Sequence, residues 1–289
     1  MKKKTSVKLL CLTLALLSLS SCQSFKRKLA GDLTDHGISM DSLGTGAVYL
    51  PANTSAPTEP SPYDTVYENC LFVGNSIMCD FYESMTKWQK EQPKLFEKVN
   101  FFCNENFSVY ENNYSNPNYA SSIFPTINVK DEMTGDPKDV KCTVETAVEH
   151  YGAELVVFCL AGINDLPVYG DEENCHVKAA SEMGRLIKNL KNKFPDVSIV
   201  VLSAPPISSE ATPMKSINNE KIKGLNEELL RVCTGNSADF IDMTSIFSDE
   251  NGSLKKEFCA DNYCKLTEDG CKAILASLRF YASKRKGEL

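Results

Sequence analysis

The chain has 289 residues, with 38 acidic and 31 basic side chains, so its formal net charge is −7 at pH 7. A net acidic chain without a Lys/Arg stripe is unsuited to a phosphate backbone, which excludes nucleic acid as a partner. With only three histidines and no cysteine pair at C-x-x-C spacing, the sequence lacks a zinc-type ligand set. We therefore expect no metal and no cofactor.

The N-terminus has the pattern of a signal peptide over residues 1–21. Lys2–Lys4 precede the mostly apolar run Leu9–Leu19, which is shorter than the about 20 residues of a membrane span. The run ends in Leu19-Ser20-Ser21-Cys22, which resembles the lipobox of bacterial lipoproteins. This resemblance implies a lipid on Cys22 that anchors the protein to the membrane, outside the cytoplasm. An ordinary secretory signal with an incidental cysteine is the alternative.

Residues 22–66 have the composition of a flexible tether. Between positions 51 and 63, prolines alternate with Ser, Thr, Ala and Asn, and such a stretch cannot bury enough apolar surface to offset the entropy of ordering it. Residues 67–289 remain as one domain, of a size suited to a single α/β core. Outside the cytoplasm its ten cysteines permit disulfides, but the sequence does not fix their pairing.

Strand-like and helix-like segments alternate along this domain. The expected strands are short apolar runs at Cys70–Val73, Lys98–Cys103, Leu155–Ala161, Val197–Ser203 and Phe240–Asp242. The expected helices lie at Phe81–Gln89, Cys142–Tyr151, 177–190, 222–229 and Thr267–Ala282. The stretch Asn104–Lys141 is expected to be an irregular lid or binding loop. The alternation predicts a doubly wound parallel sheet with function at the carboxyl ends of its strands.

Two of these strand ends carry polar groups that could cooperate. The first strand ends in Gly74-Asn75-Ser76, where a glycine turn and a following helix would present Ser76 as a nucleophile beside backbone N–H groups. The third ends in Gly162-Ile163-Asn164-Asp165, where the Asn164 amide could donate to the same oxyanion. Helix capping and an Asx-turn are the structural alternatives for these motifs.

In this order and at these strand ends, the two motifs resemble the SGNH/GDSL hydrolase superfamily over nearly all of residues 66–282. The resemblance implies a flavodoxin-like three-layer α/β/α sandwich with a mostly parallel five-stranded sheet. It also implies an esterase or acylhydrolase with Ser76 as nucleophile and Asn164 in the oxyanion hole. The implied partner is a carboxylic ester, either a small molecule or an O-acyl group on a glycan.

The sequence departs from the family's pattern at its first two motifs. The family has aspartate before the serine, where this chain has Asn75. The glycine of the second motif, whose N–H joins the oxyanion hole, has no counterpart in residues 104–109. Asn106 is the nearest replacement, because asparagine tolerates left-handed backbone better than other non-glycine residues.

The family's final motif, Asp-x-x-His, lacks its histidine here. Counting back from Gly270 puts Lys265 in the histidine's place, with Asn262 at the aspartate's, whereas counting forward from Asp261 puts Cys264 there. Asp261 and Lys265 are the nearest candidate bases. A lysine is protonated at its ordinary pKa of about 10.4, so burial would have to lower that pKa before it could accept a proton.

The three histidines lie elsewhere in the sequence. His36 is in the expected tether, His150 near the end of an expected helix, and His176 after the Asn164 loop, where it could in principle replace the missing base. Without a positioned base the serine hydroxyl is a poor nucleophile. We therefore expect weak or rewired ester hydrolysis, and the alternative is a non-catalytic glycan- or envelope-binding lipoprotein on the same fold.

Overall fold

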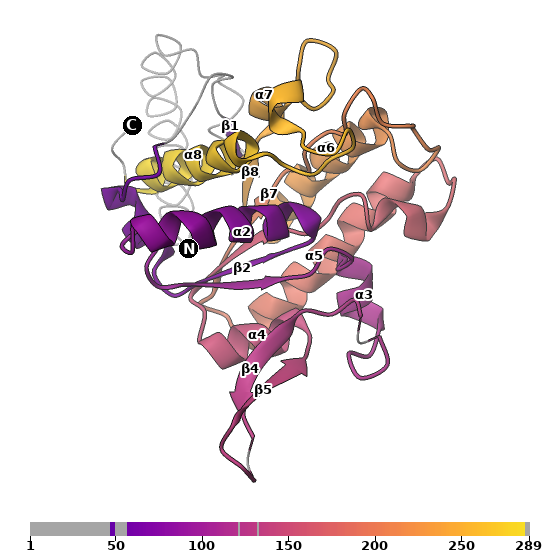
Figure 1. Ribbon diagram of the computed structural model, residues 1–289. Helices are drawn as coiled ribbons and strands as arrows, with labels where there is room; N and C mark the ends of the chain where they lie inside the picture. Colours follow the sequence, from indigo (N-terminus) through magenta and orange to yellow (C-terminus); the bar gives the residue numbers. More distant parts are fainter. Residues whose placement is uncertain (1–46, 50–56, 121, 132, 287–289) are drawn as a thin grey trace, which may run out of the picture. The chain divides into compact units, whose positions relative to one another are not determined.

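The computed structural model describes residues 47–49, 57–120, 122–131 and 133–286. The predicted signal peptide, Cys22 and His36 lie outside these ranges. The described part holds a parallel sheet in the order β1-β8-β7-β6-β2-β3 and a separate antiparallel hairpin, β4–β5 (Figure 1). The strands are β1 Ala47–Tyr49, β2 Cys70–Gly74, β3 Val99–Cys103, β4 Thr126–Lys130, β5 Pro137–Lys141, β6 Leu155–Cys159, β7 Ser198–Leu202 and β8 Asp239–Asp242.

Helices cover both faces of the sheet (Figure 1). One face carries η2 Pro62–Tyr67, α2 Ser76–Glu91, α7 Thr244–Phe247, η4 Lys256–Phe258 and α8 Glu268–Arg285. The other carries α3 Val109–Tyr114, α4 Val144–Tyr151, η3 Leu166–Tyr169, α5 Cys175–Lys193 and α6 Asn219–Gly235. A hydrophobic core lies on each face of the sheet. Successive side chains of β2 point to opposite faces, so Leu71 packs into one core and Phe72 into the other. None of the described helices is both long and apolar enough to cross a membrane.

The sheet confirms the predicted fold class. Five neighbouring strands of the sheet lie in the order β3-β2-β6-β7-β8. When these five are numbered by their order along the chain, the arrangement is 2-1-3-4-5, which is the flavodoxin-like order. A sixth strand, β1, extends the expected five by pairing in parallel with β8, Val48 opposite Ile241. It comes from the stretch for which composition predicts a tether.

The stretch Asn104–Lys141 is not the irregular loop that its composition suggests. It contains α3, which Ser108 caps by accepting a hydrogen bond from the Glu111 N–H at 3.1 Å, and the β4–β5 hairpin. At the hairpin's turn, Asp131 accepts from two backbone N–H groups and Gly135 has a φ of +74°. The hairpin lacks the apolar run of a buried strand, which is why the sequence pattern missed it.

The strand order reverses between β2 and β6, where such sheets bind their ligands. In the register, Gly74 lies opposite both Cys103 of β3 and Cys159 of β6, so these strands end level with one another. Backbone hydrogen bonds extend the match, with Asn75 N donating to Cys159 O at 3.3 Å and Asn104 N donating to Gly74 O at 3.2 Å. The start of α2 at residues 75–77 and the loops 104–107 and 160–164 consequently meet at one edge of the sheet.

Candidate active site

Ser76 is the first residue of α2, as the sequence predicts. Asn75 caps this helix by accepting a hydrogen bond from the Ile77 N–H at 3.2 Å. The Ser76 side chain is partly exposed, and no hydrogen bond engages its hydroxyl within the described residues. The hydroxyl therefore stands free beside the partial positive charge of a helix N-terminus.

The asparagine that precedes Ser76 performs a task that aspartate could not. Asn75 is buried, and its Nδ2 donates to the carbonyl oxygen of Leu160 at 3.0 Å. An ionised carboxylate has no proton to donate there. This departure from the family pattern therefore joins the Ser76 turn to the loop that follows β6.

Glycine is required at the start of the turn. A Cβ atom on Gly74 would lie 2.4 Å from the Met78 Cβ and 2.5 Å from the Cys159 carbonyl oxygen. Both distances are far below van der Waals contact, so any side chain would push α2 away from β6. Close packing of helix against strand is what brings Ser76 to this edge.

Asn164 lies at the same edge, but its amide is directed at a neighbouring loop. Its Nδ2 donates to Glu105 O at 2.9 Å and to Phe107 O at 3.0 Å. These two bonds use both amide protons. In this structure Asn164 joins the loop after β6 to the loop after β3, and an oxyanion would have to compete for its protons.

Asn106, proposed above as a second oxyanion donor, is exposed. Its backbone N–H donates to Asn104 Oδ1 at 3.0 Å. The left-handed backbone that motivated its choice is absent, because Asn106 is not among the positive-φ residues of the described chain. The residue is close to the site in sequence, but its donor is already used.

A small pocket opens beside the Ser76 turn. Its volume is about 20 Å³, which holds about one water molecule. The wall is formed by the ends of β2, β6 and β7 and by one residue of the final motif: Asn75, Ile77, Cys159, Ala161, Gly162, Ile163, Ala204, Pro205 and Cys264. The final motif therefore reaches the Ser76 turn through Cys264, and burial raises the pKa of this thiol to about 12.

The two candidate bases of the final motif have different surroundings from Cys264. Asp261 Oδ1 accepts hydrogen bonds from the backbone N–H groups of Tyr263, Cys264 and Lys265 at 2.8–3.0 Å, which closes the turn between them. Both Asp261 and Lys265 are exposed, and neither lines the pocket. Asn262 has a φ of +63°, a left-handed conformation that asparagine tolerates.

Asp80 is a site residue that the sequence reasoning missed. It lies on α2 one turn after Ser76, and its Oδ2 accepts the Leu266 N–H at 2.8 Å. Burial raises the pKa of this carboxyl to about 6, although the Leu266 N–H and the positive charge of Lys265 act to lower it. Its i,i+4 spacing from Ser76 was the available signal, because it places both side chains on one face of the helix.

Asp165 holds the Asn164 loop in place from the buried side. Its carboxylate accepts the Tyr110 N–H at 3.0 Å and the Gly162 N–H at 3.3 Å. Burial raises the pKa of Asp165 to about 7. This residue fixes α3 against the loop after β6, so its role is structural.

The described histidines lie away from this pocket. His150 stacks edge-on against Tyr151 at the end of α4. His176 packs against α6, where a Cβ on Gly224 would lie 2.9 Å from its ring. Neither lines the pocket, and within the described ranges no group of three or more His, Cys, Asp or Glu could hold a metal ion.

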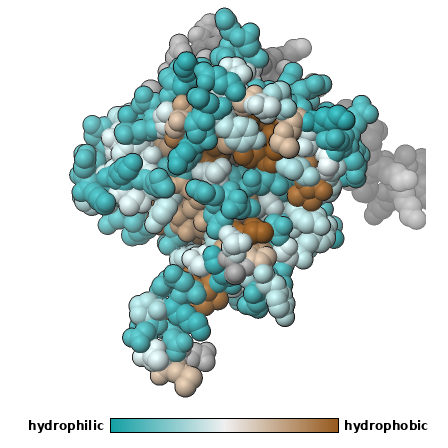
Figure 2. All heavy atoms as spheres, turned by 45° about the vertical axis from the view of Figure 1, so that its right-hand side comes forward, coloured by the Kyte–Doolittle hydropathy of each residue, from teal (hydrophilic) through white to brown (hydrophobic). Residues whose placement is uncertain are grey.

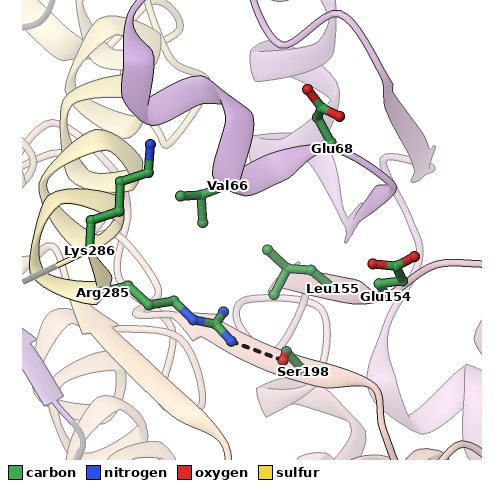
Figure 3. A pocket seen from close by; sticks show the side chains of 7 residues that line it. All are labelled: Val66, Glu68, Glu154, Leu155, Ser198, Arg285 and Lys286. Carbon is green, nitrogen blue, oxygen red and sulfur yellow. Dashed lines mark hydrogen bonds between the residues drawn. The ribbon is translucent and has the colours of Figure 1, made fainter.

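A larger pocket, of about 320 Å³, lies at the opposite edge of the sheet. Figure 3 shows Arg285 and Lys286 on one side of it and Glu68 and Glu154 on the other, with Arg285 bonded to Ser198. It opens at the amino ends of β6 and β7, whereas Ser76 follows the carboxyl end of β2. We therefore place the chemistry at the smaller pocket.

The surface around these features is mostly hydrophilic. Figure 2 shows scattered apolar areas on the body and, below it, the β4–β5 hairpin as a projecting arm. Met133, at the turn of the hairpin, is 94% exposed. No residue of the arm lines the small pocket.

Known proteins support this picture at the level of family and fold. The GDSL-like lipase/acylhydrolase family matches residues 131–273. A GDSL-like lipase from Bacteroides thetaiotaomicron superposes with a TM-score of 0.52 at 14% identity, covering 78% of this chain and 92% of that one. A proposed acylhydrolase from Bacteroides fragilis gives 0.51 at 14% identity, covering 75% and 86%. No curated protein sequence matches the chain.

Proposed function

We propose that this chain, which belongs to the SGNH/GDSL hydrolase superfamily, hydrolyses carboxylic esters with Ser76 as its nucleophile. The observation that supports this most is the position of Ser76. Its unengaged hydroxyl stands at the N-terminus of α2, at the point where the strand order reverses and beside a pocket. Ligands of open α/β sheets bind at this point.

The reaction that this geometry suits is acyl transfer to serine. Ser76 Oγ attacks the ester carbonyl carbon and loses its proton to a base, while negative charge develops on the carbonyl oxygen. The partial positive charge at the N-terminus of α2 would stabilise that charge. The acyl-serine then reacts with water, which returns the serine and releases the acid.

The general base is the weak element of this mechanism. Cys264, one of the two positions that align with the family's histidine, lines the pocket, and a thiol with a raised pKa accepts no proton from serine at neutral pH. Asp80 joins Asp261 and Lys265 as a candidate base. A triad lacking one member retains about 10³–10⁴-fold acceleration over water from the remaining groups, so we propose slow catalysis.

One observation favours a second function, the binding of a glycan or envelope component without hydrolysis. Both amide protons of Asn164 are already donated to Glu105 O and Phe107 O, and the pocket holds about one water. A site that had lost hydrolysis could keep its loops tied in this way. This reading differs from the first in giving Ser76 no reactivity.

The location and the substrate are parts of the same proposal. A lipid on Cys22 would hold the domain at the membrane outside the cytoplasm, within reach of O-acyl groups on envelope or environmental glycans. Replacing Cys22 by alanine should block both lipidation and cleavage before residue 22, leaving a larger, unlipidated species with a changed mass and changed detergent partitioning. Cys11→Ala, in the signal itself, is the matched control and should leave both properties unchanged.

The decisive experiment for hydrolysis is covalent labelling of Ser76. A fluorophosphonate should modify the wild-type protein at this residue, and hydrolysis of p-nitrophenyl acetate should be slow and lost in Ser76→Ala. Ser209→Ala, at an exposed serine, should keep the wild-type rate. Absence of label together with an unchanged rate in Ser76→Ala would instead support the binding function.

A further inference from the structure

The larger pocket, at the amino ends of β6 and β7, has walls of opposite charge. Arg285 and Lys286 lie on one side of it, and Glu68 and Glu154 lie on the other (Figure 3). Within the described residues, neither cation forms an ion pair with either glutamate, and Glu68 pairs instead with Lys98 at 3.3 Å. The pocket therefore keeps a positive and a negative wall apart across a cavity.

Backbone hydrogen bonds position the negative wall. The Glu154 N–H donates to Asn69 O at 3.1 Å, and the Ser198 N–H donates to Glu154 O at 2.9 Å, so the parallel ladder continues beyond the strand ends. The Asn69 side chain also holds Glu154, by donating from Nδ2 to Oε1 at 3.4 Å. Glu68 directly precedes Asn69, whose φ of +58° turns the chain before β2. Both carboxylates are thereby brought to one rim of the pocket.

The positive wall is the C-terminal end of α8, where the helix dipole favours basic residues. Arg285 donates from Nη2 to Ser198 Oγ at 3.1 Å and from Nη1 to Tyr281 OH at 3.3 Å. These bonds use two of the five N–H donors of a guanidinium. Lys286 donates to Pro62 O at 2.7 Å, which holds its ammonium group against η2. The guanidinium is therefore fixed in place and retains N–H groups that can bind an anion.

The space between the two walls is apolar and larger than a single ion needs. Val66 and Leu155 lie between the charged side chains (Figure 3). The volume of about 320 Å³ corresponds to roughly ten water molecules at about 30 Å³ each. An extended dipeptide spans about 7 Å and suits a cavity of this size. A ligand that contacts both walls must carry opposite charges at the two ends of an uncharged middle.

We propose that this pocket binds a short zwitterionic peptide of about two residues, with its carboxylate at Arg285 and its terminal ammonium at Glu154. A guanidinium presents a planar pair of donors that matches a carboxylate, and an ammonium group has three donors for the glutamate oxygens. An apolar side chain of the peptide would pack on Val66 and Leu155. Because Ser76 follows the opposite edge of the sheet, this binding does not depend on ester hydrolysis.

The test is a titration of the full chain, purified in detergent, with the dipeptide alanyl-leucine, followed by saturation-transfer NMR. We expect saturable binding. N-acetyl-alanyl-leucine lacks the ammonium and alanyl-leucinamide lacks the carboxylate, so the Kd of each should be about three- to tenfold higher. Absence of saturable binding, or equal affinity for a blocked peptide, would overturn the proposal.

Substitutions locate the binding on the protein. Glu154→Gln and Arg285→Gln each remove one charge from the pocket and should raise the Kd for alanyl-leucine by about three- to tenfold. Glu210→Gln and Arg231→Gln make the same changes at exposed residues outside the pocket and should keep the wild-type Kd. Equal weakening in all four variants would overturn the assignment to this pocket. If Arg285→Gln fails to fold, the blocked peptides on the wild-type protein still decide the question.

Phosphoethanolamine distinguishes a peptide from a zwitterion whose anion is a phosphate. We expect it to displace alanyl-leucine only at a higher concentration than unlabelled dipeptide does, because its charges are separated by a shorter middle without an apolar side chain. Displacement at a lower concentration would contradict the peptide assignment. Alanyl-leucine should also raise the Tm of the wild type, since a ligand that binds the folded state stabilises it, and this rise should be smaller in Glu154→Gln.

Discussion

The amide nitrogen of Asn164 lies 2.9 Å from the carbonyl oxygen of Glu105, and the same nitrogen lies 3.0 Å from Phe107 O. A residue expected to stabilise an oxyanion is thus the tie between the loops after β3 and β6. The two roles exclude one another while both amide protons are donated to these carbonyls. A loop movement that breaks one of these two hydrogen bonds would free an amide N–H of Asn164 to donate to an oxyanion.

Replacing Asn164 should therefore affect stability as well as activity. Asn164→Ala leaves two carbonyl oxygens without their donor, and we expect the free energy of unfolding to fall by about 1–3 kcal/mol. Urea unfolding followed by circular dichroism measures this. Asn106→Ala removes an exposed amide from the neighbouring loop and should change stability by less than about 0.5 kcal/mol. Equal stabilities for the two variants would contradict the structural role.

A second test restores the family's usual residue, by replacing Asn75 with aspartate. In Asn75→Asp the carboxylate loses the donation to Leu160 O and faces that oxygen across a buried contact. We expect a loss of about 1–3 kcal/mol in unfolding free energy at pH 8, smaller at acidic pH where the carboxyl is protonated and can donate again. Unfolding midpoints in urea at both pH values check it.

The matched control for that variant is Asn106→Asp, which makes the same chemical change at an exposed position. It should show little change at either pH. A pH-independent loss in Asn75→Asp would show that packing, rather than the donated hydrogen bond, makes asparagine necessary.

The pKa of Asp80 predicts how stability depends on pH. Burial raises it from an ordinary 3.8 to about 6, so folding favours the protonated carboxyl. The resulting stabilisation is present below about pH 4 and is lost as the pH rises through 6. Asp80→Asn keeps an acceptor for the Leu266 N–H and removes the charge, so it should be more stable than wild type by about 1–2 kcal/mol at pH 8, after allowance for solvent screening.

This difference should shrink toward zero at pH 4, which distinguishes a titrating carboxyl from a general packing effect. Denaturant unfolding of both proteins across pH 4–8 measures it. Glu83→Gln, on the exposed side of the same helix, should follow the wild-type curve. If Asp80→Asn also abolishes fluorophosphonate labelling of Ser76, Asp80 is the base.

The sequence predicted the parts of this site that depend on local chemistry. A five-residue buried strand, a glycine that nothing can replace and a helix cap are neighbours in the chain, so Ser76 could be placed on its turn. The alternation of strands and helices likewise predicted the sheet. These features need no knowledge of distant residues.

Features that depend on distant packing could not be predicted in this way. The β4–β5 hairpin has one buried residue, Ile127, and its alternation of Ile127 and Val129 with polar residues is short and lies in a polar stretch. The use of both Asn164 amide protons and the contact of Asp80 with Leu266 join segments far apart in the chain. Composition and spacing carry no signal for such contacts.

The final motif shows the same distinction, and it leads to the last prediction. Two alignments put the missing histidine at Lys265 or at Cys264. In the structure Cys264 lines the pocket beside the Ser76 turn, whereas Lys265 is exposed. Cys264→His also restores Asp-x-x-His, because Asp261 precedes it by three residues and keeps one carboxylate oxygen outside the turn it closes.

We therefore expect Cys264→His to raise Ser76-dependent hydrolysis of p-nitrophenyl acetate by about 10²–10⁴-fold, because a positioned general base contributes that much. The rate should rise with pH through about 6.5, where histidine loses its proton. Lys265→His, even combined with Asn262→Asp, should gain less, because its imidazole starts from an exposed position. A larger gain in the Lys265→His, Asn262→Asp double variant would show that Lys265, and not Cys264, occupies the histidine position. No gain in either, with a correctly folded protein and an unreactive Ser76, would mean that the edge where β2 and β6 end binds its ligand without cleaving it.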